Sequence, residues 1–384
     1  MARETMTSEE RVWAAIQLEK PDRVPIDILA TAAYTKATGG TTADWYLNED
    51  KAWAAIDKVW DYTGGWDMDL ASVPMSLMAS KLTWALTEGT KIAFPGVELP
   101  DDYTFQVLEE EVLKPEDYDT IAEIGWERFM LEDYLFRILD ITPEGLTKAQ
   151  EDQVSGFPKA LDRWGKRGVV TAYPGTLYIL HPFFRFSLGR SMLKFTEDLY
   201  YSPEKVIRAL KTVTREAIEQ WINSCKALDL KLNFLVEERA GGFFFPPAIF
   251  ERFWWPYTIE IVDALWSEGI VTWFHLDQCW DKNIPYFKQL PRGSAVLALD
   301  GTTDIFAAKE VLRGHLCLAG DVHPTLLSLG KPEEVEAYCK RLIDEVGSDG
   351  GFILSSGCEM PTAAKIENWR AMVQTGKNYE FSKK

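Results

Sequence analysis

Short apolar runs recur along the chain, and a helical pattern follows most of them. Each run contains Val, Ile, Leu or Phe, and the last five runs end at a polar residue. Such runs are typical of buried parallel strands, because both faces of a parallel sheet are covered. The runs cover residues 23–29, 68–74, 169–174, 232–237, 271–275, 295–300, 316–321 and 352–356.

The segments between the later runs carry apolar residues at the three-to-four-residue spacing of helices. Residues 246–266 show this spacing, and we expect a kink at Pro256. Residues 363–375 show it as well, with Gly376 where a helix C-cap is expected.

Eight strands alternating with helices predict an α/β fold, a (β/α)8 TIM barrel that forms a single domain over residues 1–384. An open doubly wound sheet is the structural alternative. That fold would need a glycine-rich phosphate turn after its first strand, which this sequence lacks. Residues 48–167 contain few strand patterns, so we expect N-terminal helical insertions over the barrel mouth there.

The composition narrows the class of protein. Hydrophobic residues make up 46% of the 384 residues, which is enough for a full core and excludes a disordered chain. The net charge of −18 argues against binding to nucleic acid or to an anionic membrane surface. We find no membrane span and no secretion signal, so we expect a cytoplasmic protein. The five scattered cysteines do not form a disulfide pattern, and the sequence leaves the oligomeric state open.

Side chains that can bind a metal follow three of the predicted strands. If side chains alternate along each strand, His275 and Asp277 point inward together, as do Glu237 and, just past the last strand, Cys358. An imidazole, a thiol and carboxylates together suit Zn²⁺, which accepts nitrogen, sulfur and oxygen donors. We therefore predict a metal site formed by His275, Cys358, Glu237 and Asp277, the first three being catalytic. Each residue alone also fits a structural role.

An aromatic loop follows the fourth predicted strand and supplies candidates for substrate binding. Phe243 and Phe244 lie in this loop, and an apolar loop beside charged groups would exclude water from a pocket. We add Tyr173 and Asp27, which lie near the ends of two other predicted strands. The alternatives are that the rings only pack against the barrel and that the Asp27 carboxylate only closes a turn.

Five stretches of the sequence resemble the uroporphyrinogen decarboxylase superfamily, and together they run nearly from end to end. The resemblance implies a β/α barrel throughout the chain. The stretches are EKPDRVPIDI (19–28), KPEDYD (114–119), NFLVEERAGGFFFPPAIFERFWWPY (233–257), LAGDVHPTLLSLGKPEEV (318–335) and GGFILSSGCEMPTAAKIENWRAMV (350–373).

The superfamily has two branches, which the residues near the N-terminus help to separate. The decarboxylases bind a polyanionic tetrapyrrole with an Arg-Gln-Ala-Gly-Arg motif, whereas residues 30–34 here are Ala-Thr-Ala-Ala-Tyr and contain no arginine. The other branch consists of corrinoid-dependent methyltransferases, which bind zinc through His-x-Cys at the fifth strand and a cysteine after the eighth. His275 and Cys358 match the first and last of these ligands, and Asp277 replaces the middle cysteine.

This resemblance implies a zinc-dependent methyltransferase of the O-demethylase type. It would move a methyl group between a small donor, such as an aromatic methyl ether, and a corrinoid (cobalamin) cofactor on a partner, the corrinoid carrier protein. A cofactor-free decarboxylase and a methylcobalamin:thiol methyltransferase are the alternative functions. The donor, the acceptor and the direction of transfer stay open.

Overall fold

All eight apolar runs contain strands of the structure. The computed structural model describes residues 4–70, 72–171 and 179–381. The strands are β1 (Asp27–Ile28), β2 (Met68–Asp69), β3 (Ile92–Ala93), β4 (Gln106–Val107), β5 (Val170–Thr171), β6 (Ile179–Leu180), β7 (Leu232–Glu237), β8 (Val271–Leu276), β9 (Ala295–Leu299), β10 (Cys317–Val322) and β11 (Phe352–Ser356). β3, β4 and β6 lie outside the predicted runs, and β3 and β4 form a separate antiparallel pair.

The remaining strands form a parallel series. One sheet has the order β11-β10-β9-β8-β7-β6, and a second has the order β1-β2-β5. A parallel bridge between Ile26 and Leu354 joins the segment before β1 to β11. Joined in this way, the two sheets form one series with β5 at one end and β6 at the other. Residues 172–178, which connect these two strands in the sequence, lie outside the described residues. This architecture confirms the prediction of an α/β fold with parallel strands.

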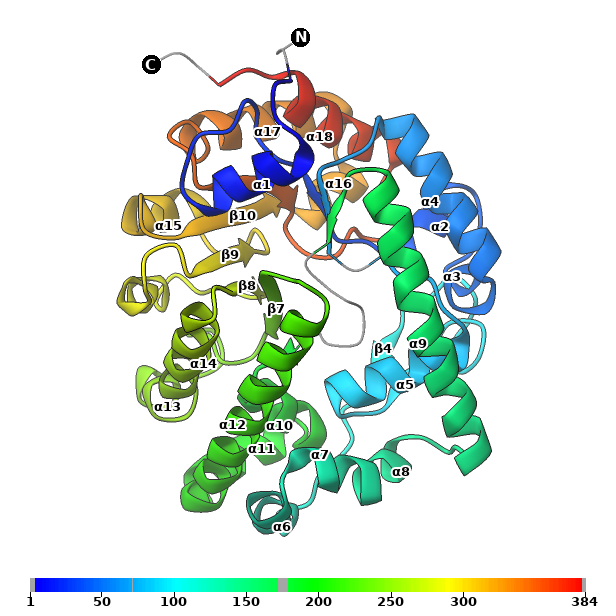
Figure 1. Cartoon of the computed structure of the whole chain (residues 1–384), viewed down its shortest axis with the longest axis vertical. Coiled ribbons are helices and arrows are strands. Elements are labelled where there is room, and N and C mark those ends of the chain that lie inside the picture. Colours follow the sequence, from blue (N-terminus) through cyan, green and yellow to red (C-terminus); the bar gives the residue numbers. More distant parts are fainter. Residues whose placement is uncertain (1–3, 71, 172–178, 382–384) are drawn as a thin grey trace.

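Helices surround the parallel strands (Figure 1). A typical one, α12, buries Val206, Leu210, Val213, Ala217 and Trp221 along one face. Within the described residues, no helix has the length and apolar character needed to cross a bilayer. The helices are α1 (Ser8–Ile16), α2 (Ala33–Ala37), α3 (Ala43–Leu47), α4 (Glu49–Thr63), α5 (Leu77–Glu88), α6 (Asp117–Ile124), α7 (Trp126–Phe129), the π-helical turn η1 (Met130–Tyr134), α8 (Leu135–Ile138), α9 (Pro143–Lys166), α10 (Pro182–Arg190), α11 (Met192–Tyr201), α12 (Pro203–Ala227), α13 (Pro247–Phe253), α14 (Trp255–Ser267), the 3₁₀ helix η2 (Ile284–Gln289), α15 (Ile305–Leu312), α16 (Pro324–Leu329), α17 (Pro332–Glu345) and α18 (Ile366–Asn378).

Two local predictions were wrong. Residues 246–266 form two helices, α13 and α14, which are separated at Trp254. Pro256 does not kink a helix, because it lies in the first turn of α14, where its missing N–H costs no hydrogen bond. Gly376 lies inside α18 and does not cap it. A Cβ at this position would lie 2.7 Å from Cγ1 of Ile26 and 3.1 Å from Cδ2 of Leu354, so the glycine lets the helix approach the strands closely.

Alternate side chains of the parallel strands form an apolar cluster inside the series. β8 contributes Val271 and Trp273, and β7 contributes Leu232, Phe234 and Val236. The register pairs these residues directly, Leu232 with Val271 and Phe234 with Trp273. The even-numbered residues of β7 and the odd-numbered residues of β8 therefore face the same interior, which determines which polar residues can reach it at the strand ends.

A buried network of charges links α1 to the first strands. Arg11 contacts Asp22 and Asp67 at 2.7 Å, and Arg23 contacts Asp67 at 2.7 Å. All four side chains are at most 7% exposed. The Asp67 carboxylate also accepts the backbone N–H of Ile26, next to β1, at 3.0 Å. Asp67 therefore positions β1 as well as balancing two buried guanidinium groups.

We expect the substitution Asp67→Asn to lower the free energy of unfolding by about 3–5 kcal/mol, because it leaves a buried positive charge uncompensated. Urea denaturation would measure the change. Asp119→Asn is the matched control, since Asp119 pairs with Lys205 and Arg208 on the surface. If both variants unfold at the wild-type urea concentration, the network does not stabilise the fold.

Candidate metal centre

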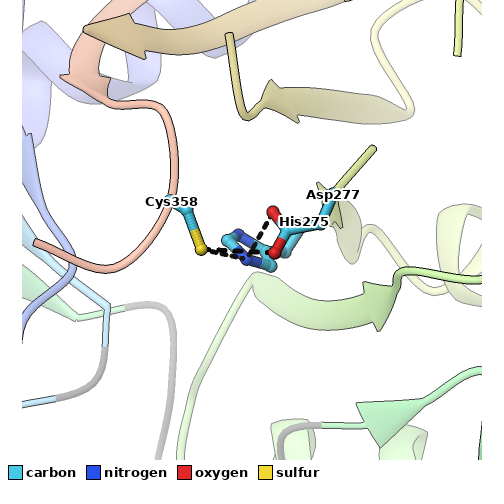
Figure 2. A group of neighbouring side chains, drawn as sticks. All are labelled: His275, Asp277 and Cys358. Carbon is cyan, nitrogen blue, oxygen red and sulfur yellow. Dashed lines mark hydrogen bonds and ion pairs between the residues drawn. The ribbon is translucent and has the colours of Figure 1, made fainter. Parts of the chain in front are cut away.

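Three of the four predicted metal ligands converge at the ends of the strands (Figure 2). Nε2 of His275 lies 3.3 Å from Oδ1 of Asp277 and 3.6 Å from Sγ of Cys358. Sγ of Cys358 lies 3.2 Å from Oδ2 of Asp277. One ligand atom from each residue lies within 4.8 Å of the others. We call these three residues the His–Asp–Cys cluster.

Two anchored loops present Asp277 and Cys358. Asp277 follows β8, and the next backbone N–H, that of Gln278, donates to the Asp300 carboxylate at 2.7 Å. Cys358 follows β11, and the N–H of Gly357 donates to the carbonyl of Val322 in β10 at 3.0 Å. A Cβ on Gly357 would lie 2.4 Å from the carbonyl oxygen of Asp300, so glycine allows this loop to lie against the end of β9.

Electrostatics couple the three side chains. Burial lowers the pKa of His275, but the Asp277 carboxylate more than offsets this effect and raises the pKa to about 9. Burial raises the pKa of Asp277, but the His275 imidazolium outweighs it and lowers the pKa below its usual value. Burial and the carboxylates of Asp277 and Glu238 raise the pKa of the Cys358 thiol well above its usual value. Without a metal, the cluster is therefore an ion pair beside a neutral thiol.

The donor set of the cluster fits a divalent cation such as Zn²⁺. It combines nitrogen, oxygen and sulfur, and three protein ligands leave a fourth tetrahedral position for a substrate. Oδ1 of Asp277 is buried and, apart from its ion pair with His275, has no partner among the described residues, so a cation could take the place of the imidazolium beside it. Binding would release the proton of the Cys358 thiol and that of the His275 imidazolium.

The fourth predicted ligand, Glu237, lies outside this cluster in the structure. Oε1 of Glu237 accepts the backbone N–H groups of Arg239 and Ala240, at 2.8 and 3.0 Å. Oε2 accepts the indole N–H of Trp254 at 2.7 Å and lies 3.8 Å from Nδ1 of His181. The reason is the pleat of β7, whose even-numbered side chains face the interior.

Glu238, the residue after the predicted ligand Glu237, is a neighbour of the cluster. Its side chain lines the cavity that contains the cluster. Burial, together with the carboxylates of Asp277 and Glu88, raises the pKa of Glu238 to about 8. The adjacent acids Glu237 and Glu238 mark this strand end in the sequence. Which of them reaches the cluster depends on which face of β7 points into the interior, and the sequence does not show this.

The cluster lies in a cavity of about 430 Å³. Six aromatic rings line it, and most of them come from the N-terminal half of the chain, including the insertions. These rings are Trp45, Tyr46, Trp84, Phe105, Phe184 and Phe234. The cavity is large enough for a small aromatic ligand.

None of the predicted substrate-binding residues that the structure describes lies on the wall of this cavity. Phe243 and Phe244 are 65% and 39% exposed and pack edge to face against each other, with ring centres 4.9 Å apart. Their loop therefore points toward solvent. Asp27 is fully buried, and its Oδ2 accepts a hydrogen bond from Ser355 at 3.0 Å. Tyr173 lies outside the described residues.

We expect Glu237→Gln to lower the free energy of unfolding by about 1–3 kcal/mol and to leave metal content unchanged. The side-chain amide of this variant can turn its NH2 group toward the indole N–H of Trp254. The indole N–H then has no acceptor in a buried site. Chemical denaturation and metal analysis of the same sample would test both parts. A loss of metal without a loss of stability would return Glu237 to the ligand set.

Comparison with known proteins supports a family assignment. The chain matches the family model "Uroporphyrinogen decarboxylase (URO-D)" over residues 187–379. A uroporphyrinogen decarboxylase of Syntrophotalea carbinolica is 25% identical over 169 residues, which cover 44% of this chain but only 47% of that protein. One from Azoarcus sp. is 22% identical over 257 residues, 65% of this chain and 69% of that protein.

A solved structure shares the fold of this chain. A methyltransferase from Methanosarcina mazei superposes with a TM-score of 0.69 at 16% sequence identity, and the match covers 97% of this chain and 99% of that one. The family model, by contrast, recognises the sequence itself over half of the chain, including the strand that carries His275 and the loop that carries Cys358. This chain therefore belongs to the uroporphyrinogen decarboxylase family.

Proposed function

We propose that this protein is a zinc-dependent methyltransferase that moves a methyl group between a small aromatic methyl ether and a corrinoid on a carrier protein. The observation that carries the proposal is the convergence of His275, Asp277 and Cys358 within 4.8 Å on the wall of an aromatic cavity. The fold that the chain shares with the Methanosarcina mazei methyltransferase supports the proposal.

His275, Asp277 and Cys358 would hold the zinc and leave one position directed into the cavity. When bound there, zinc supplies a Lewis acid that stabilises negative charge on the oxygen that gives up the methyl group. A corrinoid on the partner would supply the nucleophile that accepts the methyl group, and the ether oxygen would keep the bonding electron pair. The direction of transfer toward the corrinoid follows from the ether being the donor.

The cavity wall has two tasks in this scheme. The rings of Trp84, Phe105 and Phe184 offer flat apolar surfaces that orient an aromatic donor and exclude water. Trp84 and Phe105 already contact each other, with ring centres 4.4 Å apart, so this part of the wall is formed before a ligand arrives. Positioning the donor is the main contribution that the protein makes, because the two cofactors carry the bond chemistry.

The charge of the cavity disfavours a uroporphyrinogen decarboxylase, although the curated relatives carry that name. A tetrapyrrole with several carboxylates needs cations in the site. Among the described residues that line the cavity, the guanidinium of Arg239 already contacts Glu109 and the carbonyl of Ser187. Carboxyl groups of Glu88, Glu238, Asp277 and Glu359 line the same cavity.

We also infer that the parallel series closes into a (β/α)8 barrel and that the chain is one domain. β5 pairs only with β2, and β6 pairs only with β7, within the described ladders. If these two short strands share one position, the series has eight positions, which is the number in a closed TIM barrel.

We expect the purified protein to contain about one zinc ion per chain and His275→Ala and Cys358→Ser to lose it. The matched control is Cys279→Ser, because Cys279 follows β8 as well but its thiol contacts Asp281 outside the cluster. Inductively coupled plasma mass spectrometry would measure the metal. Zinc retained by both cluster variants would contradict the proposed site.

The activity itself is tested by methyl transfer from an aryl methyl ether to free cob(I)alamin, followed by its visible absorbance. Wild-type protein should methylate the corrinoid, and removal of zinc with a chelator should abolish the reaction. Turnover of uroporphyrinogen without any corrinoid methylation would establish the decarboxylase instead. The Cys279→Ser control should behave like the wild type.

A further inference from the structure

The carboxyl group of Glu238 opens into the cavity that contains the His–Asp–Cys cluster. Its side chain is partly accessible and lines the wall of that cavity. Among the described residues, it has no hydrogen-bond or ion-pair partner, and only burial and nearby charges act on its pKa. The sealed polar atoms without a partner do not include either oxygen of Glu238, so this carboxyl group can be reached from the cavity.

The strand register places Glu238 beside the cluster. The last register pair of β7 and β8 joins Glu237 to Leu276, and Glu238 and Asp277 are the next residues of the two segments. Both residues line the same cavity. Neighbouring strands lie about 4.8 Å apart, so one small ligand in this cavity can contact Glu238 while its other end lies at the cluster.

The cavity contains more carboxyl groups than a bound metal would neutralise. Asp277 and the thiolate of Cys358 would compensate a divalent cation, and the carboxyl groups of Glu88, Glu238 and Glu359 would remain on the wall. Burial, followed by the carboxylates of Asp277 and Glu88, raises the pKa of Glu238 to about 8. The positive groups nearby therefore do not offset the cost of a negative charge at Glu238.

The protein's own cation at this wall is already engaged. Arg239 is the one Lys or Arg among the described residues that line the cavity. Its guanidinium contacts the carboxylate of Glu109 and the carbonyl of Ser187, and it lies 5.8 Å from the ring centre of Phe184. A positive partner for Glu238 is therefore expected to come from the ligand.

The aromatic part of the wall suits a cation as well. The face of an aromatic ring is electronegative and attracts ammonium groups. Phe234 and Glu238 both line the cavity, and they are even-numbered residues of one strand and its continuation. The rings also exclude water, which strengthens the attraction between a carboxylate and a cation. An anionic ligand, by contrast, would be repelled by the carboxyl groups.

We propose that Glu238 binds a positively charged amine group of the methyl donor. This proposal rests on the proposed function and names its substrate class: aryl methyl ethers that carry an ammonium group, as opposed to neutral methoxyarenes or methoxybenzoates. Glu238 is then a residue that determines specificity. It binds the end of the donor that does not react, while the methoxy group lies at the metal position.

Isothermal titration calorimetry with three probes of similar shape tests the proposal without any turnover. The probes are 4-methoxybenzylamine, which is a cation near neutral pH, 4-methoxybenzyl alcohol and 4-methoxybenzoate. We expect the amine to bind roughly tenfold to a hundredfold more tightly than the alcohol, as for a hydrogen bond between charged groups. The benzoate should bind most weakly. Binding of the alcohol or the benzoate as tight as that of the amine, or no binding of any probe, would overturn the proposal.

Two variants test whether Glu238 itself binds the amine. Glu238→Gln should abolish the preference for the amine and leave binding of the alcohol unchanged, and it should fold because the carboxyl group has no partner to lose. Glu359→Gln is the matched control, since it removes a carboxylate from the same wall that the hydroxyl of Thr31 already engages. It should keep most of the preference. An equal loss in both variants would show that the charge of the whole cavity, and not Glu238, selects the amine.

Metal analysis excludes a direct role of the metal in this preference. Glu238→Gln should keep its zinc, because Glu238 lies outside the cluster. The preference for the amine should also persist in wild-type protein after treatment with a chelator. Loss of zinc from the variant would make Glu238 a metal ligand, and loss of the preference with the metal would show that the amine binds the metal. Either result would overturn the proposal.

The binding data and the methylation assay separate the two proposals. A preference for the amine that depends on Glu238, without any methyl transfer to cob(I)alamin, would contradict the proposed function and leave the amine site in place. Methyl transfer with no preference among the three probes would do the reverse.

Discussion

The parallel register of the strands is the constraint on which the site depends. His275 is paired with Val236 on one side and Ala298 on the other, and all three occupy the last layer of side chains before the strands end. Because parallel strands end at the same edge, residues far apart in sequence, such as Asp277 and Cys358, meet beyond this layer. A shift of one residue in the register of β8 would turn the imidazole away from the thiol.

The polar part of the cavity is built from acids, and this composition shapes the chemistry that it can support. A divalent cation is compensated by Asp277 and the thiolate of Cys358, so a loaded cluster adds no net charge. Glu88, Glu238 and Glu359 then surround the remaining space. In the function proposed above, a neutral or cationic donor would enter such a site without a repulsive cost, and its leaving oxygen would become anionic only where a bound metal could stabilise it. The acidic wall and the cluster thus favour the same class of ligand.

The sequence predicted the strands and most of the cluster because their signals are local. The apolar runs identify the strands, and the His-x-Asp spacing fixes the inner face of β8. Glu237 was predicted as a ligand but lies outside the cluster, since all six residues of β7 are buried and hydrophobic alternation does not show which face is the interior. The aromatic wall could not be predicted either. Trp45 and Trp84 belong to helices whose packing over the strand ends depends on contacts distant in sequence.

Gly376 links the outside of the fold to the thiol at its centre. The glycine lets α18 lie directly on Leu354 of β11, only four residues before Cys358. A methyl group at residue 376 would push α18 and β11 apart. The shift of β11 at Leu354 would move the loop that carries Sγ of Cys358, because that loop begins about two peptide units further along the chain. The ligand geometry is therefore sensitive to a surface helix that touches neither the metal position nor the cavity, and sequence changes in that helix can tune the centre remotely.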